Sequence, residues 1–278
     1  MNRPQVWPVL LAYGVALVAA TTGSIALVVA VGTHAAGGDT ARIQAEASRF
    51  ATSLSGLSLV SALNQAILLG VAVGAAWLLR GGVAAHLCVG ATRGTPLGLA
   101  AATVGATGIS LACSAALDLL ATGQGATMGA ISGALAGARP VGLALAVLAL
   151  CVAPAVGEET FFRGLVQTRL RERWGAAPAI VVSAALFGLL HLDPIQGSVA
   201  FVVGLYLGVA AHRLGGVRAS ALAHGVNNAF FLALAAAGTG EASRAGAAAQ
   251  LGAGLAICGA SLAFLRSPRA VTASTPAS

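Results

Sequence analysis

Long apolar runs separated by short polar links dominate the chain. Eight runs reach or approach the roughly 17–25 residues that a helix needs to cross a bilayer; they lie near 7–31, 57–79, 97–120, 141–165, 179–195, 198–212, 217–237 and 248–265. The fifth and sixth are short, and the link 193–197 between them is a candidate to dip into the protein interior. The pattern predicts an all-α, polytopic integral membrane protein with about eight transmembrane helices.

Composition agrees with this pattern. Hydrophobic residues make up 58% of the chain, charged residues 8%, and the mean hydropathy is +0.89. A soluble domain carries roughly 25% charged residues, so a soluble fold is excluded. We expect a single membrane domain over 1–278, with N-terminal spans in 1–135 and a disordered tail at 267–278, which is rich in Ser, Thr and Pro.

The links differ in character. The first run is too long for the apolar part of a signal peptide, so we expect it to stay as a first span. The link 32–56 contains a good helix-forming stretch at 41–50, which we place at the outer surface. The stretch 121–140 is rich in Gly and Ala and predicts a flexible outer loop or a weak helix. Asp193 is expected to cap the link that it begins.

The basic residues are all arginine, and their distribution predicts an orientation. One side of the membrane receives Arg3, Arg80, Arg93, Arg169, Arg171, Arg173, Arg213, Arg218, Arg266 and Arg269, and the other receives Arg42, Arg49, Arg139 and Arg244. Because cytoplasmic links carry the excess of basic residues, we expect both termini in the cytoplasm. The Gly- and Ala-rich, lysine-free composition suggests a bacterial cytoplasmic membrane. The dispersed arginines and few aromatics indicate no nucleic-acid partner.

A short ionisable segment interrupts the fourth run: Glu158 and Glu159, followed by Arg163. A charged side chain at the centre of a spanning helix costs about 2.5–3.5 kcal/mol even on insertion-based scales, so it usually marks a functional site. Glu159 and Arg163 are spaced i,i+4 with the acid first, which is the favoured order for an ion pair. Glu158 is rotated by about 100° from Glu159 on a helix, so we expect it to point elsewhere, unpaired.

Two other runs carry polar groups at apolar positions. His191 ends the main apolar part of the fifth run, and His224 and Asn228 share one face of the seventh. Counting about 1.5 Å per residue from the flanking turns predicts that Glu158, His191 and His224 reach the same depth, in the cytoplasmic half of the membrane. The neighbouring amide Asn227 stays open as an alternative to Asn228.

The polar set resembles a known family. Its order and spacing are similar to the three motifs of the CAAX protease and bacteriocin-processing family, polytopic intramembrane endopeptidases that include the type II CAAX prenyl proteases. The matching motifs are Glu158-Glu159-x-x-x-Arg163, Phe187-x-x-x-His191 and His224-x-x-x-Asn228. Each motif alone is weak, whereas the set is specific. The resemblance implies a catalytic core over 140–235 and a catalytic cavity open to the cytoplasmic half.

The resemblance also implies roles for individual residues. Glu158 would act as general base on a water molecule, and His191 would help to hold and activate that water. His224 and Asn228 would stabilise the oxyanion of the tetrahedral intermediate. Fixed donors in a low-dielectric cavity are well suited to stabilising such a charge.

The same motifs imply a supporting ion pair and leave open whether the site binds a metal ion. Glu159 and Arg163 would form a supporting ion pair. Glu158, His191 and His224 make a His₂Glu set, which is also a catalytic zinc donor set. The favoured scheme requires no cofactor, and zinc bound by these three residues is the alternative.

The expected function is an intramembrane endopeptidase. Its partners would be the lipid bilayer and a peptide or a lipidated or otherwise membrane-anchored protein substrate. A non-catalytic membrane scaffold or bacteriocin-immunity protein of the same fold is the alternative. A proton-coupled transporter that uses the same acid and histidines is a third class, which the lack of a recognisable internal repeat disfavours.

Overall fold

The structure, a computed structural model, describes residues 5–79, 82–90, 92–123, 125–238 and 243–271. Every regular element within these ranges is helical. Seven helical stretches are long and apolar enough to cross a bilayer, and a shorter apolar helix, Ala176–Leu190, follows the fourth. The predicted all-α, polytopic membrane fold is therefore confirmed for the described part of the chain.

The N-terminal half contributes three spanning helices, α1 (Trp7–Ala36), α3 (Leu54–Leu78) and α5 (Pro96–Leu120). Short helices join them: η1 (Thr40–Arg42), α2 (Ile43–Ala51) and α4 (Val83–Leu87). Hydroxyl side chains fix two of the starts. Ser53 accepts a hydrogen bond from the N–H of Gly56 at α3, and Thr95 accepts one from the N–H of Gly98 at α5. The helix α2 occupies the stretch where the sequence predicts a surface helix.

The stretch 121–140 contains a helix, α6 (Gly125–Leu135). Its composition alone predicts only a loop or a weak helix. A contact from far along the chain holds its first turn, because the hydroxyl of Thr127 donates to Asp193 Oδ2 at 3.2 Å. Residues 121–140 alone do not reveal this contact, because Asp193 lies 66 positions away from Thr127.

The fourth span is a continuous helical stretch from Pro140 to Trp174. It alternates between α and π hydrogen bonding through α7 (Pro140–Val147), π-helical η2 (Leu148–Val152), α8 (Ala153–Glu159), π-helical η3 (Thr160–Gln167) and α9 (Thr168–Trp174). π turns are rare and occur frequently at functional sites. Here they flank α8, which ends with the two glutamates.

The C-terminal half consists of α10 (Ala176–Leu190), α11 (Pro194–Leu214), α12 (Val217–Ala236), α13 (Arg244–Leu265) and the short η4 (Pro268–Ala270). α10 is shorter than the predicted fifth span because a new helix begins directly after it. Asp193 accepts hydrogen bonds from the N–H groups of Ile195 and Gln196, and Pro194 occupies the first helical position. The expected capping role of Asp193 is present.

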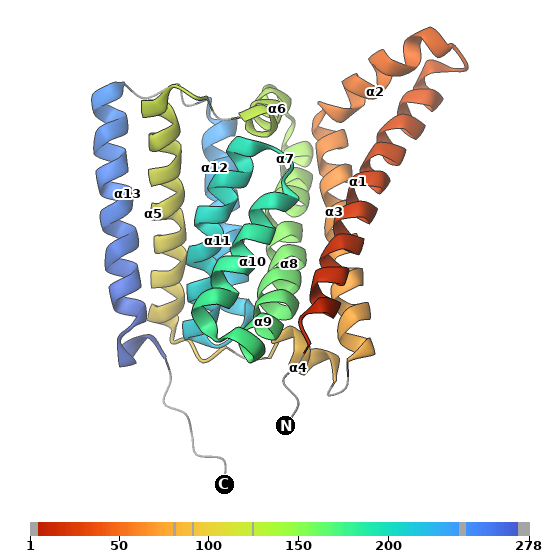
Figure 1. Cartoon of the computed structure of the whole chain (residues 1–278). Helices are drawn as coiled ribbons and strands as arrows, with labels where there is room; N and C mark the ends of the chain where they lie inside the picture. Colours follow the sequence, from red (N-terminus) through yellow and green to blue (C-terminus); the bar gives the residue numbers. More distant parts are fainter. Residues whose placement is uncertain (1–4, 80–81, 91, 124, 239–242, 272–278) are drawn as a thin grey trace.

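The spans form one bundle, with α1 beginning and α13 ending at the same end (Figure 1). We call this the termini end, and we call the opposite end, where α2 and α6 lie, the α6 end (Figure 1). α8 packs against both α3 and α12, α10 packs against α11, and α13 packs on the outside against α5. The glutamates of α8 are thus surrounded by helices from both halves of the chain.

The predicted disordered tail, 267–278, is ordered in its first part. Ala270 in η4 is buried, and its carbonyl oxygen accepts a hydrogen bond from the N–H of Thr95 at 3.0 Å. Gly98 makes room for this contact, since a Cβ at that position would meet the same carbonyl. Residues 272–278 lie outside the described residues.

Candidate active site

The paired glutamates occupy the last turn of α8, deep in the bundle. Only 9% of Glu158 and none of the surface of Glu159 is exposed. The preceding glycine lets α3 approach closely, because a Cβ at Gly157 would lie 2.6 Å from Oε1 of Gln65. The two carboxylates face different neighbours. Glu158 faces α3 and a cavity, whereas Glu159 faces Arg163 and α12.

The predicted ion pair between Glu159 and Arg163 is present. Arg163 Nη1 donates to Glu159 Oε1 at 2.8 Å. Arg163 Nη2 donates to the carbonyl oxygen of Gly204 on α11 at 3.0 Å. The guanidinium carbon also lies 4.7 Å from the centroid of the Phe187 ring on α10. The pair therefore joins the fourth span to α10 and α11.

His224 lies between the two glutamates. Its Nδ1 is 2.9 Å from Glu159 Oε1, and its Nε2 is 3.8 Å from Glu158 Oε2. A carboxylate only accepts hydrogen bonds, so Nδ1 carries a hydrogen and donates to Glu159. Nε2 is then the nitrogen that faces Glu158. Glu159 consequently does more than pair with Arg163, since it also orients an expected site residue.

His191 reaches the same place from the end of α10. Its Nδ1 is 3.0 Å from the carbonyl oxygen of Phe187, and a carbonyl only accepts, so Nδ1 carries a hydrogen. In the neutral ring this makes Nε2 the nitrogen with a lone pair. The Phe187 ring packs edge-on against both histidines, with centroid distances of 5.1 Å to His191 and 6.0 Å to His224.

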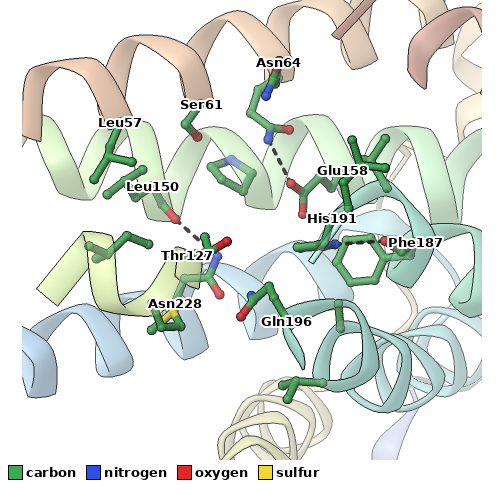
Figure 2. Close-up of a pocket in the computed structure, with 18 of the residues that line it drawn as sticks. Leu57, Ser61, Asn64, Thr127, Leu150, Glu158, Phe187, His191, Gln196 and Asn228 are labelled. Atoms are coloured by element: carbon green, nitrogen blue, oxygen red, sulfur yellow. Dashed lines mark hydrogen bonds between the residues drawn. The ribbon is translucent and has the colours of Figure 1, made fainter. Parts of the chain in front are cut away.

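Two neighbouring amides on α12 also line the cavity. Asn228 Nδ2 donates to the carbonyl oxygen of Leu150 at 3.3 Å, within π-helical η2 (Figure 2). Asn227 is buried, and its Oδ1 has no hydrogen-bond partner among the described residues. The amide group of Asn228 has a second N–H besides the one that it gives to Leu150.

Gln65 on α3 is a site residue that the sequence analysis missed. Its Nε2 donates to Glu158 Oε1 at 2.9 Å, and the bond is buried. The sequence did hold a signal, because the adjacent amides Asn64 and Gln65 interrupt an apolar spanning run. The predicted unpaired state of Glu158 is wrong in this respect.

A cavity of about 560 Å³ joins the site residues. Figure 2 shows Glu158, His191 and Asn228 around it, from α8, the end of α10 and α12. Side chains of α1, α3, α5, α6 and α11 complete the wall, most of them apolar. Uncharged polar groups are spread among them: Ser24, Ser61, Asn64, Thr127 and Gln196. The arrangement suits an extended, largely uncharged ligand in contact with the Glu158 carboxylate.

The cavity lies toward the α6 end of the bundle. Part of its wall is α6 itself, and His191 follows the whole of α10, a helix about 22 Å long at 1.5 Å per residue that starts at the termini end. The cytoplasmic position of the termini and the opening of the cavity to the cytoplasmic half both stay predictions.

The predicted zinc set does not form a metal site in this arrangement. In the described ranges, no group of three or more His, Cys, Asp or Glu side chains is placed to hold a metal ion. His224 Nδ1 is committed to Glu159 and His191 Nδ1 to a backbone carbonyl. Zinc bound by Glu158, His191 and His224 therefore stays a prediction.

Comparison with known proteins identifies the motif-bearing region. Residues 140–230 match the family described as type II CAAX prenyl endopeptidase Rce1-like. The match covers 91 of 278 residues, about a third of the chain, and contains all the predicted site residues. It confirms the family that the three motifs indicate, which is a family of proteases. No curated protein and no solved structure matches the chain.

Proposed function

We propose that the chain is an intramembrane endopeptidase in which Glu158 and His191 activate a water molecule for attack on a peptide bond. The carrying observation is that Glu158, His191 and His224, from three different helices, meet at one cavity within a bundle of apolar helices. No arginine forms an ion pair with Glu158 within the described part of the chain, and such a carboxylate is costly in that setting. The substrate would be a peptide or a lipidated or otherwise membrane-anchored protein.

The proposed reaction begins with proton transfer from water to Glu158. The water oxygen attacks the carbonyl carbon of the scissile bond, and the electrons of the C=O bond move to the oxygen as an oxyanion. The proton held by Glu158 then passes to the leaving nitrogen as the C–N bond breaks, so the carboxylate is regenerated. His191, whose Nδ1–H is given to Phe187, offers Nε2 as an acceptor that orients the water.

His224 and Asn228 are the proposed donors to the oxyanion. His224 already gives Nδ1–H to Glu159, so donation from Nε2 requires the doubly protonated ring. Carboxylate oxygens lie on either side of the ring, 2.9 Å from Nδ1 and 3.8 Å from Nε2. Asn228 would use the N–H that does not contact Leu150.

Comparative peptide profiling tests the proposal and searches for the substrate together. Membranes from cells that express the wild type, Glu158→Ala or His191→Ala would be compared by mass spectrometry. Glu172→Ala, which removes a surface carboxylate on α9, is the matched control. We expect product peptides with the wild type and the control, and none with the two site variants. Identical profiles for all four proteins would contradict the proposal.

Two further readouts separate the alternatives. If Glu158→Ala and His191→Ala keep the full cellular phenotype of the wild type, the scaffold or immunity function replaces the protease. Metal is tested on the purified protein by chelation and elemental analysis. The proposed scheme predicts that cleavage survives chelation. A metal mechanism would replace the proposed scheme if chelation abolished cleavage and if zinc were recovered from the wild type but not from Glu158→Ala.

A further inference from the structure

Gln65 contacts the proposed general base from outside the family-matched region. It lies on α3, and its Nε2 donates to Glu158 Oε1 at 2.9 Å, with only 8% of the glutamine exposed. We propose that Gln65 is a positioning residue for the reaction: it anchors Oε1 of Glu158 so that Oε2 faces His224 and the cavity. This inference rests on the proposed function of Glu158.

The chemistry of the contact fixes the orientation of the Gln65 amide. An ionised carboxylate only accepts hydrogen bonds, so the NH₂ group must face Glu158. Oε1 of Gln65 is then turned toward Gly157, where it has no hydrogen-bond partner among the described residues. A buried amide oxygen without a partner is unfavourable. If position 65 only filled space, Leu or Met would be more favourable there than glutamine, because neither buries an unpartnered oxygen. The contact with Glu158 is therefore the feature that favours glutamine.

Other charged or titratable groups face Glu158 from the neighbouring helices. His224 on α12 has Nε2 at 3.8 Å from Oε2, and His191 at the end of α10 lines the same cavity. Arg163, one turn further along the same helical stretch, is within electrostatic range. These groups act on Oε2 or on the overall charge of Glu158, whereas Gln65 holds Oε1 directly. The two carboxylate oxygens therefore have separate environments.

Gln65→Met tests the assignment because it preserves size and removes the donor. Without that donor, Oε1 of Glu158 loses its anchor and Oε2 is no longer held toward His224 and the cavity. We expect kcat to fall by about tenfold and KM to change little, because Glu158 acts on the chemical step.

Gln167→Met is the matched control. Gln167 is also buried, with 4% exposed, and its Nε2 donates at 3.0 Å, but to the backbone carbonyl of Gly208. Its Oε1 likewise lacks a hydrogen-bond partner among the described residues. It therefore reproduces the burial, the bond length and the free oxygen of Gln65 without touching a site residue. This control should lower stability and leave kcat and KM unchanged.

Infrared spectroscopy gives a readout that does not depend on the substrate. The carboxylate stretching band of Glu158 in purified protein is assigned by its disappearance in Glu158→Gln. We expect the frequency of this band to shift in Gln65→Met, which lacks the hydrogen bond to Oε1, and to be unchanged in Gln167→Met. Gln65→Asn, which keeps the amide but shortens it, should shift the band the same way and serves if Gln65→Met does not fold.

The outcomes separate the inference from the proposed function. Equal band frequencies and equal kcat values in the wild type, Gln65→Met and Gln65→Asn would overturn the role of Gln65. A shifted band together with full cleavage by Glu158→Ala would support the contact and overturn the function of Glu158. A shifted band, a lowered kcat and an inactive Glu158→Ala would support both.

Discussion

Arg163→Met should destabilise the protein strongly, because it leaves the carboxylate of Glu159 buried without its arginine. The Arg163 side chain is 1% exposed and that of Glu159 is 0% exposed, and their atoms Nη1 and Oε1 are 2.8 Å apart. After the change, His224 still donates to Glu159. Breaking a buried ion pair from one side typically costs about 3–5 kcal/mol.

The other contacts of Arg163 add to this loss. The carbonyl oxygen of Gly204 loses a charged donor at 3.0 Å, an effect of about 1–3 kcal/mol. The contact with the Phe187 ring contributes about 0.5–2 kcal/mol. These terms share one side chain and do not simply add, so we expect about 3–5 kcal/mol in total. Adding Glu159→Gln removes the stranded charge, and the double variant should recover about 2 kcal/mol.

The assay is reversible unfolding of the purified protein in mixed micelles. Arg169→Met is the matched control, because Arg169 pairs with Glu172 at 2.7 Å near the surface, with side chains 14% and 37% exposed. We expect the control to change the free energy of unfolding by about 0–1 kcal/mol. The reasoning is refuted if Arg163→Met is no more destabilised than this control, or if the double variant is less stable than either single variant.

Three further predictions concern packing, a helix cap and topology. Gly157→Ala should lower the free energy of unfolding by about 1–3 kcal/mol, because the added Cβ would meet Gln65. Gly74→Ala is the control and should be tolerated, because nothing lies within 4 Å of the added Cβ. Equal effects of the two changes would contradict the close α3–α8 packing. Backbone N–H groups, first that of Gln196, hold the pKa of Asp193 below its usual value, so its stabilising effect is present above about pH 4 and is lost as the pH falls through the lowered value. Asp193→Ala should therefore cost about 1 kcal/mol at neutral pH and less in acid, and an unfolding midpoint equal to that of the wild type at neutral pH would count against the cap. If the termini are cytoplasmic, a cysteine introduced at Ser243 should react with an impermeant maleimide on intact cells. A cysteine introduced at Arg173 should then react only after lysis. The reverse pattern would place the α6 end of the bundle toward the cytoplasm.

Local helical geometry explains what the sequence could predict about the site. Glu159 and Arg163 are four residues apart on one helix, so their pairing follows from spacing alone. The turn between α10 and α11 follows from Asp193 and Pro194, which cap and begin a helix. Apolar length similarly predicts the spans, although α10 falls short of a full span. Each of these features depends on residues that are close in sequence.

Contacts between distant helices account for what the sequence could not predict. Gln65 and Glu158 are 93 positions apart, and their bond depends on how α3 packs against α8 at Gly157. The contact of His224 with Glu159 depends in the same way on the packing of α12. The π-helical segments on either side of α8 change which residues share a face, and the apolar pattern does not reveal them. The side of the bundle that holds the cavity follows from the same packing.

Cleavage by purified protein is the most direct test of the central claim that Glu158 serves as the general base. The substrate is a synthetic peptide that contains the cleavage sequence found by membrane profiling, and the comparison is between the wild type and Glu158→Gln, which nearly keeps the shape of the side chain. Loss of a general base typically lowers the rate by about 10²–10⁴-fold. We predict a fall in kcat of that size with both proteins equally folded. Equal cleavage rates for the two proteins would contradict the account.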